Sequence, residues 1–344
     1  MADPSTQPAT TATAPAPPDR RGTAPDKSSG LGGQKSTRGG DAAFKFISTG
    51  AGAILLLIMG AIAAFLVYKS IDAFTSNDGN FFTEKTWTPD PPEPGGPSVF
   101  GIAALTYHTV VTGIIAMLIA VPVAIGIALF ITFYAPRRLS QGLAYLVDLL
   151  AAVPSVVYGL WGLFFLVPNM TGLTLFLDQY LGWIPLFDYR PDDIPGNRSD
   201  FTVGIVLAVM ILPIVAAITR EVFRQVPPAH VEGALALGAT RWEMIRLSVL
   251  PFGRAGMVSA AILGLGRALG ETLAVTIILA SAYNVSIHIT ENGGVTFASN
   301  IANKYDEAGE IGTSALIASG LCLFVITLIV NSLSQLIVRR KKEA

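Results

Sequence analysis

Six stretches of the chain are almost continuously apolar, and polar segments rich in Pro, Gly or charged residues separate them. A hydrocarbon core of about 30 Å takes roughly 20 apolar residues as a helix. The pattern therefore predicts an all-α integral membrane protein, a six-transmembrane-helix bundle that occupies residues 46–338. The apolar pattern of the second stretch begins near Phe100, so its helix is expected to extend beyond the bilayer. The predicted spans are residues 46–68, 109–133, 142–166, 202–219, 257–281 and 313–337.

Composition agrees with a membrane location. The chain is 51% hydrophobic and only 14% charged, whereas soluble domains average about 25% charged residues. Residues 1–45 differ from the rest, because they are rich in Ala, Pro, Thr and Gly and have almost no large apolar residue before Phe44. Such a segment buries too little surface to offset its ordering entropy, so a disordered N-terminal tail is expected.

Positive charge predicts the orientation, since Lys and Arg are concentrated in cytoplasmic segments of membrane proteins. With the N-terminus inside, the inner segments hold 17 of the 23 Lys and Arg residues and the outer segments hold five. Both termini are therefore expected in the cytoplasm, including the basic C-terminus at residues 339–344. The inner segments are residues 1–45, 134–141, 220–256 and 338–344.

The side chains that usually hold metals or disulfides are few and scattered. The single cysteine, Cys322, lies inside an apolar stretch, and the three histidines are far apart in the sequence. A disulfide framework is excluded, and no metal, redox site or cofactor is expected.

The inner loop at residues 221–251 is too long for a simple connector and too polar for the membrane. Pro228 can begin a helix, and Gly238 can end it with a sharp bend. Thr240 can cap a second helix, with Glu243 completing a capping box, and that helix is expected to end near Pro251. A helix–Gly–helix element of this kind is either a surface for another protein or an amphipathic helix at the membrane interface.

Two charged residues lie inside the fifth predicted span. Arg267 is about 10 residues from its inner end, a depth of roughly 15 Å, and an Arg there costs about 2.5–3.5 kcal/mol. Glu271 follows four residues later, on the same face of a continuous helix. One interpretation is an ion pair that locks the bundle. The other is a polar path for an anion, because intramembrane charges often mark a substrate route and Arg presents donors that match an oxyanion.

Other polar residues in the spans have weaker claims. Asp148 is six residues into the third predicted span, where a bond to a neighbouring helix is the main alternative to a place on the substrate path. Tyr158 could donate its hydroxyl to a substrate or to another helix. Prolines at 122, 154 and 213 interrupt spans, as they commonly do beside transport paths.

The inner loop resembles the EAA loop of bacterial ATP-binding-cassette import permeases, in which Glu-Ala-Ala, three residues, Gly, nine residues and Ile-x-Leu-Pro follow one another. Two positions depart from that pattern, Gly233 and Ser248. The resemblance implies a coupling helix that fits a groove of a separate ATPase subunit. The matching residues are Glu232, Ala234, Gly238, Leu250 and Pro251.

The stretches GRALGETLAV (266–275) and VPSVVYGLWGLFFLVP (153–168) resemble the PstC family of phosphate-specific permeases. That resemblance implies a type I importer fold in the bacterial inner membrane, with Arg267 and Glu271 implicated in phosphate passage. It also implies a PstA-like second permease, two PstB-like ATPase subunits and an extracytoplasmic PstS-like phosphate-binding protein. The chain has no Gly-x₄-Gly-Lys-Ser/Thr loop, so ATP hydrolysis is expected on a partner and the chain itself is not expected to be an enzyme.

Two alternatives remain open at this point. One is a permease for another oxyanion, such as sulfate, molybdate or phosphonate. The other is a membrane scaffold that transports nothing, in which Arg267 and Glu271 only hold helices together.

Overall fold

The structure is a computed structural model that describes residues 38–91, 93, 95–188 and 197–340. The chain divides into two units at residues 59 and 60, and each unit is described by itself. In the first unit the described residues, 38–59, are the start of helix α1 (Arg38–Ser76). Residues 38–45 are thus helical, although the tail was expected to reach residue 45. The remainder of the expected tail, residues 1–37, lies outside the described residues. So do residues 341–344 of the basic C-terminus.

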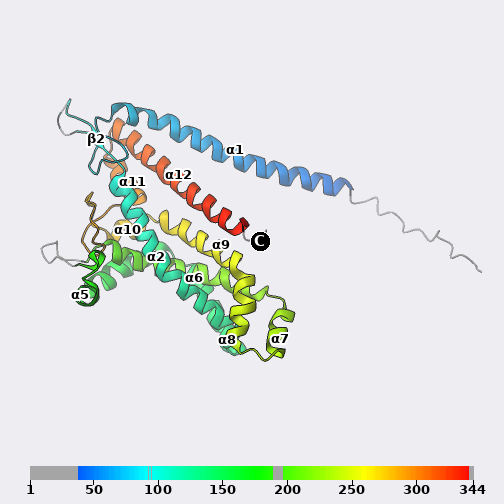
Figure 1. Cartoon of the computed structure of the whole chain (residues 1–344). Helices are drawn as coiled ribbons and strands as arrows, with labels where there is room; N and C mark the ends of the chain where they lie inside the picture. The colour runs from blue at the N-terminus through cyan, green and yellow to red at the C-terminus, as the bar shows by residue number, and fades with distance from the viewer. Residues whose placement is uncertain (1–37, 92, 94, 189–196, 341–344) are drawn as a thin grey trace, which may run out of the picture. The chain divides into compact units, whose positions relative to one another are not determined.

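The second unit contains the end of α1 and all other elements, most of which are helical (Figure 1). In chain order these are β1 (Trp87–Thr88), β2 (Val99–Phe100), α2 (Ala103–Leu129), the π-helical turn η1 (Phe130–Tyr134), α3 (Arg137–Ala151), α4 (Ser155–Trp161), the π-helical turn η2 (Gly162–Leu166), α5 (Val167–Leu181), the 3₁₀ turn η3 (Pro185–Phe187), α6 (Asp200–Arg224), α7 (Pro228–Ala236), α8 (Arg241–Met244), the π-helical turn η4 (Ile245–Val249), α9 (Leu250–Leu269), α10 (Leu273–Ile278), α11 (Phe297–Lys304), the 3₁₀ turn η5 (Tyr305–Glu307) and α12 (Glu310–Arg340).

Six helical runs in the described part are long and apolar enough to cross a membrane, which confirms the predicted fold class. Four of them contain the spans expected from the sequence or nearly all of them. The third and fifth are displaced. These six runs are Gly40–Ser76, Ala103–Tyr134, Ser155–Leu181, Asp200–Arg224, Arg241–Leu269 and Glu310–Leu333.

The third run begins 13 residues later than expected because the backbone breaks before Pro154. Helix α3 ends at Ala151, and Pro154, which has no N–H to continue the ladder, stands at the N-cap of α4. Beyond the expected end at residue 166, polar side chains are satisfied within the helix itself. Asn169 donates to the Phe165 carbonyl at 2.6 Å, and Thr174 donates to the Met170 carbonyl at 3.0 Å. Such bonds satisfy the polar side chains, so that the helix can continue through an apolar environment.

Small residues allow the central helices α2, α6 and α9 to approach closely. Four alanines of α2, four residues apart, have no exposed surface: Ala116, Ala120, Ala124 and Ala128. On α6, a Cβ added to Gly204 would lie 2.4 Å from the side chain of Ile115, so no larger residue fits there without movement. Small residues at helix contacts are the usual means of packing in membranes, where the lipid removes the hydrophobic drive between helices.

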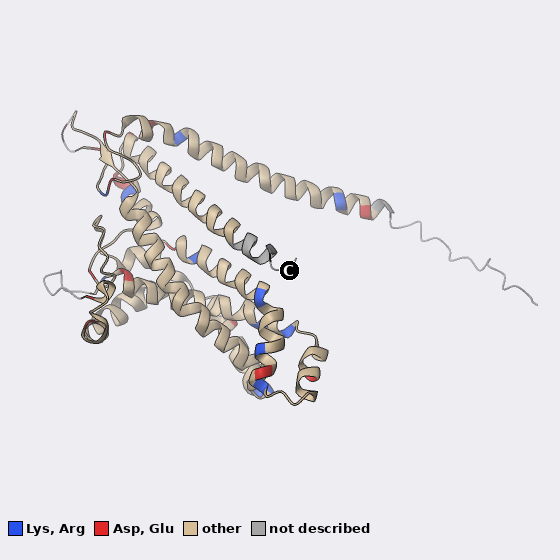
Figure 2. Ribbon diagram, viewed as in Figure 1, with Lys and Arg blue, Asp and Glu red and all other residues tan. Residues whose placement is uncertain are grey.

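The two ends of the bundle differ in structure and charge. Helices α7 and α8 lie at one end, and α11 and the short β1–β2 ribbon lie at the other (Figure 1). Basic residues gather around α8 and the start of α9, as the colouring of the ribbon in Figure 2 shows. At the opposite end, Tyr283 donates to the Asn300 side chain at 2.6 Å. Burial, with Glu307 as a second cause, raises the pKa of Tyr283 to about 12, so its hydroxyl stays protonated and keeps donating.

Candidate functional site

Arg267 lies near the end of α9 on an open cavity of about 670 Å³. The side chain is exposed, and in the described part of the chain no ion pair or hydrogen bond to it is found. One face of α9 supplies most of the lining, and α6 and α12 supply the rest. The lining residues are Ile214, Ser259, Ile262, Leu263, Gly266, Arg267 and Asn331. A permanently charged guanidinium is therefore available to a ligand on a membrane-spanning helix.

Glu271 does not share a helical face with Arg267, so that expectation was wrong. Helix α9 ends at Leu269, residues 270–272 form a break, and α10 starts at Leu273. Glu271 lies in the break with only 8% of its surface exposed. Its carboxylate accepts a bond from the Ala274 N–H at 3.2 Å, which satisfies a donor at the start of α10. No Arg267–Glu271 ion pair is found among the described residues.

The apolar pattern alone conceals this break, because residues 257–281 are nearly all compatible with one long helix. Two low-propensity residues, Gly270 and Thr272, flank Glu271. The buried Glu271 carboxylate caps the next helix, so a backbone N–H that the break leaves without an intrahelical partner has an acceptor nearby. Discontinuous helices of this kind are typical of substrate sites in membrane transporters.

Tyr158 lies on α4, and its hydroxyl donates to the Leu150 carbonyl of α3 at 3.0 Å. This bond spans the interruption at residues 152–154. Tyr158 is largely buried, and its hydroxyl hydrogen is committed to this backbone carbonyl.

Asp148 pairs with Arg220 of α6, a residue that the sequence analysis assigned only to the inner loop. Both Asp148 carboxylate oxygens accept from one Arg220 nitrogen at 3.1 Å. A second Arg220 nitrogen donates to the Ala144 carbonyl at 3.1 Å. The structure thus places Asp148 in a contact between α3 and α6, and Asp148 is not among the residues that line the Arg267 cavity. Arg220 has no sequence signal beyond its position at the end of a span.

The helix–Gly–helix element at residues 228–244 has the predicted form. Helix α7 ends at Ala236, and Gly238 follows with φ +84°. The capping box is confirmed: Thr240 Oγ1 accepts from the Glu243 N–H at 3.3 Å, and Glu243 accepts from the Thr240 N–H at 2.8 Å. Glu232 is exposed, and Leu237 between the helices is 91% exposed.

The second helix does not end near Pro251 as expected. Helix α8 continues through the π-helical turn η4 into α9, and Pro251 lies in the first turn of α9. Pro251 has no N–H to donate, and the wider π-helical turn just before it lets the helix continue past this missing hydrogen bond. Leu250 is half-buried there, and both Leu250 and Ala234 pack against a buried apolar cluster that includes Phe223 and Met244. Ser248, which departs from the EAA pattern, donates to the His230 carbonyl of α7 at 3.4 Å.

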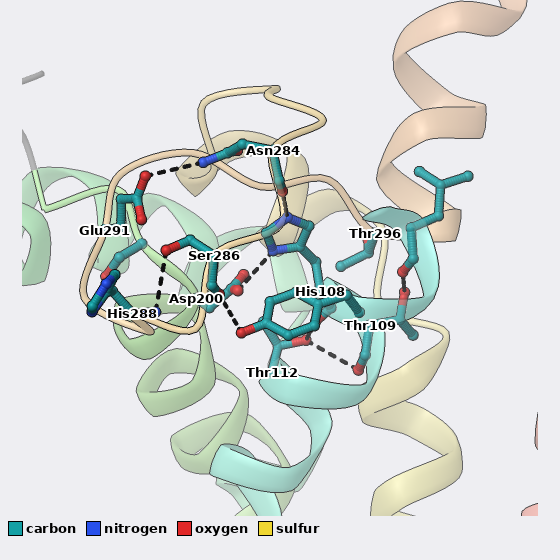
Figure 3. Close-up of polar contacts among 12 residues, drawn as sticks. His108, Thr109, Thr112, Asp200, Asn284, Ser286, His288, Glu291 and Thr296 are labelled. Atoms are coloured by element: carbon teal, nitrogen blue, oxygen red, sulfur yellow. Dashed lines mark hydrogen bonds and ion pairs between the residues drawn. The ribbon is translucent and has the colours of Figure 1, made fainter. Parts of the chain in front are cut away.

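A buried polar cluster at the opposite end was missed by sequence reasoning (Figure 3). His108 Nδ1 lies 2.7 Å from an Asp200 carboxylate oxygen, and His108 Nε2 lies 2.8 Å from the Asn284 carbonyl oxygen. The two side chains are only 4% and 5% exposed. Each residue stands in the first turns of an apolar helix, which is the one feature of the sequence that could have indicated a pair.

The sequence matches, over residues 120–343, the family described as binding-protein-dependent transport system inner membrane component. The chain belongs to this permease family. Two similar proteins are both phosphate transport system permease proteins, PstC 2 of Mycobacterium tuberculosis and PstC of Mycobacterium leprae. The first is 46% identical over 88% of this chain and 93% of its own length, and the second is 48% identical over 80% and 86%.

More distant relatives of this binding-protein-dependent permease carry the same description. PstC of Pasteurella multocida is 38% identical over 84% of this chain and 89% of its own length. Among solved structures, a chain of a bacterial ABC transporter involved in the import of alginate aligns with a TM-score of 0.49 and 20% identity, over 68% of this chain and 78% of that one. As a member of the family, the chain is a multi-pass inner membrane component of a transporter and not an enzyme.

Proposed function

We propose that this permease is the PstC-type subunit of an ATP-driven importer of inorganic phosphate and that Arg267 contacts the anion during passage. The observation that carries the residue assignment is the exposed Arg267 guanidinium, which lines a cavity and has no ion partner among the described residues. The substrate class is supported by the relatives, which are described as phosphate transport system permeases at 38–48% identity.

The chemistry of Arg267 suits this role. Its planar fork of N–H donors matches the oxygens of a phosphate ion, and its charge persists at every physiological pH. A desolvated oxyanion needs such a partner, since moving a bare charge through a low-dielectric region is strongly unfavourable. One arginine is too little for a multiply charged anion, so a PstA-like second permease would supply further groups.

ATP hydrolysis on a partner subunit would act on the end of the molecule that carries α7 and α8. The helix–Gly–helix element of α7 and α8 presents exposed Glu232 and Leu237 and would fit a groove on a PstB-like ATPase, two copies of which serve the two permeases. Its packed inner side would transmit movement through η4 to α9, which carries Arg267. A PstS-like binding protein would deliver phosphate at the end that carries α11 and the β1–β2 ribbon.

The deciding experiment is phosphate uptake per assembled complex in cells that lack their own system. Arg267→Gln removes the charge and keeps a polar side chain, and losing a charged contact of about 3 kcal/mol corresponds to about a hundredfold lower uptake. Arg267→Lys should also transport poorly, because a point charge replaces the planar fork. Arg138→Gln, at the exposed start of α3, is the charge-matched control and should transport normally.

Two outcomes favour the alternatives. Normal uptake by an assembled Arg267→Gln complex would contradict the anion contact. Recovery of transport in the double mutant Arg267→Gln with Glu271→Gln would support a helix lock, although the lack of an Arg267–Glu271 pair in the described residues speaks for the anion role. Excess sulfate or molybdate should leave phosphate uptake unchanged, whereas strong competition would indicate a different oxyanion.

A further inference from the structure

Residues 198–201, at the start of α6, bind the segment that follows α10 at several points. We call residues 198–201 and His108, together with the residues between 277 and 294 that they bind, the clasp. Its backbone bonds run from the Arg198 N–H to the Asn292 side chain at 2.7 Å, from the Gly293 N–H to the Arg198 carbonyl at 3.1 Å, and from the Phe201 N–H to the Ile289 carbonyl at 3.0 Å.

The His108–Asp200 pair is the buried centre of the clasp (Figure 3). A carbonyl oxygen only accepts, so His108 Nε2 must donate its hydrogen to Asn284. Nδ1 and the Asp200 carboxylate therefore share one proton in a site closed to water. The backbone of Gly294 covers the pair, since an added Cβ there would lie 2.9 Å from His108 Nδ1. The segment is thus fixed on α2 and α6 at one point.

Arg198 makes the contact that reaches α10 itself. Its Nε donates to the Ile278 carbonyl at 2.9 Å, and Nη2 donates to the Ile277 carbonyl at 3.0 Å. These are carbonyls at the C-terminal end of α10, where intrahelical donors are missing and a positive charge is favourable. A helix of six residues has little stability of its own, so its position depends on such contacts.

Helix α10 also packs against α4, but its connection to α9 is not helical. A Cβ added to Gly159 of α4 would lie 2.8 Å from the Ala274 Cα, so α4 and α10 are in close backbone contact. The break at residues 270–272 therefore joins two helices, α9 and α10, that are held by different contacts. Helix α9 continues from α8, whereas α10 is bound to the clasp and to α4. Arg267 lies one turn before this joint.

We infer that Arg198 is a positioning residue for the anion path: by binding the last carbonyls of α10, it holds the joint at 270–272 beside Arg267 in its transport-competent geometry. This inference rests on the proposed function of Arg267. Loosening α10 would let the joint move and would displace Arg267 relative to the cavity, with no direct contact between Arg198 and the anion. Among the described residues, both hydrogen bonds of the Arg198 guanidinium go to backbone carbonyls of α10, which commits it to this structural contact.

The experiment uses the assembled transporter in membranes, with Cys322→Ser as background and Thr272→Cys as a reporter in the half-buried joint. A small water-soluble thiol reagent measures the labelling rate without phosphate or binding protein, and uptake is measured separately. Arg198→Gln should raise the labelling rate about threefold or more and lower uptake per complex about tenfold. Lys304→Gln changes a cation of the same end whose ion pair in the described part of the chain is with Glu307, and it should alter neither measurement.

Arg198→Lys keeps the positive charge and a single N–H donor group, so it should give intermediate labelling and uptake. If Arg198→Gln does not assemble, this variant replaces it in the test. Unchanged labelling in both variants would overturn the positioning role, whatever happens to uptake. Faster labelling with unchanged uptake would overturn its link to transport. Failure of the proposed function appears elsewhere, as normal uptake in Arg267→Gln, and leaves the labelling result intact.

Discussion

Arg220 shows how this permease holds a charge between helices. The residue is only 7% exposed, yet it meets the Ala144 carbonyl and both oxygens of Asp148. Taking two charges out of water costs several kcal/mol, and close pairing offsets that cost only when the geometry is good. Here the Asp148 side chain stays 52% exposed, so its oxygens keep contact with the surroundings and the penalty falls mainly on Arg220.

Removing the carboxylate should therefore destabilise the protein by leaving a buried guanidinium without its counter-ion. We expect Asp148→Ala to lower the free energy of unfolding by about 1–3 kcal/mol, less than for a fully buried pair because Asp148 is half exposed. The measurement is thermal unfolding of the purified complex in detergent. Glu221→Ala breaks a surface pair with Arg224 at 3.8 Å and should shift stability by much less. Equal shifts in the two variants would show that the Arg220 contact has no special weight.

Single residues were predictable where they contrasted with their neighbours. Arg267 stands out in an apolar stretch, and its exposure on a cavity agrees with a polar role. Arg220 was not recognisable, because a charge at the end of a span fits either solvent or the interior. The partner of His108 was likewise hidden, since Asp200 is 92 residues away and only tertiary packing brings the two together.

The α7–Gly238–α8 element was largely predictable because its signals are local. A proline start, a left-handed glycine and a capping box act within a few residues of each other. The continuation through Pro251 and the break before α10 were not predictable. The first depends on a π-helical turn, and the second depends on the Glu271 carboxylate, which is buried in the folded chain and bonds to the start of α10.

Gly238→Val should uncouple ATP use from transport. No atom lies within 4 Å of an added Cβ, so the penalty comes from the backbone: φ is +84°, a region that costs side-chain-bearing residues about 1–2 kcal/mol and β-branched residues more. The bend between α7 and α8 should relax while insertion continues. We expect uptake per assembled complex to fall at least fivefold, measured together with ATPase activity.

Gly233→Ala is the matched control for this variant. Gly233 is inside α7, exposed, with nothing within 4 Å of an added Cβ and no positive φ. Alanine there should strengthen the helix by about 0.5–1 kcal/mol and leave uptake normal or improved. Normal uptake in Gly238→Val, at a normal amount of protein, would contradict the coupling role of this element.

The charge distribution of the whole chain points to one orientation. Figure 2 shows basic residues gathered around α8 and the start of α9. Arg241 lies in α8, Arg246 in η4 and Arg254 in α9. Arg220 and Arg224 lie in the last turns of α6. At the opposite end, around η5 and the start of α12, acidic residues dominate: Asp306, Glu307 and Glu310. Since cytoplasmic loops retain Lys and Arg, the α7–α8 end is predicted to face the cytoplasm, where ATP is available to a partner.

Single cysteines can test this orientation in intact cells with a membrane-impermeant maleimide, in a Cys322→Ser background. Cysteines at Lys85 and Asp306, both exposed, should react at once because their end is predicted to face outward. Cysteines at Arg138 and Gln225, also exposed, should react only after the membrane is permeabilised, and that second step shows that the thiols themselves are competent. Reaction of 138 and 225 in intact cells, with 85 and 306 protected, would reverse the orientation. It would also place the helix–Gly–helix element away from ATP, so the same result would remove the proposed site of ATPase coupling.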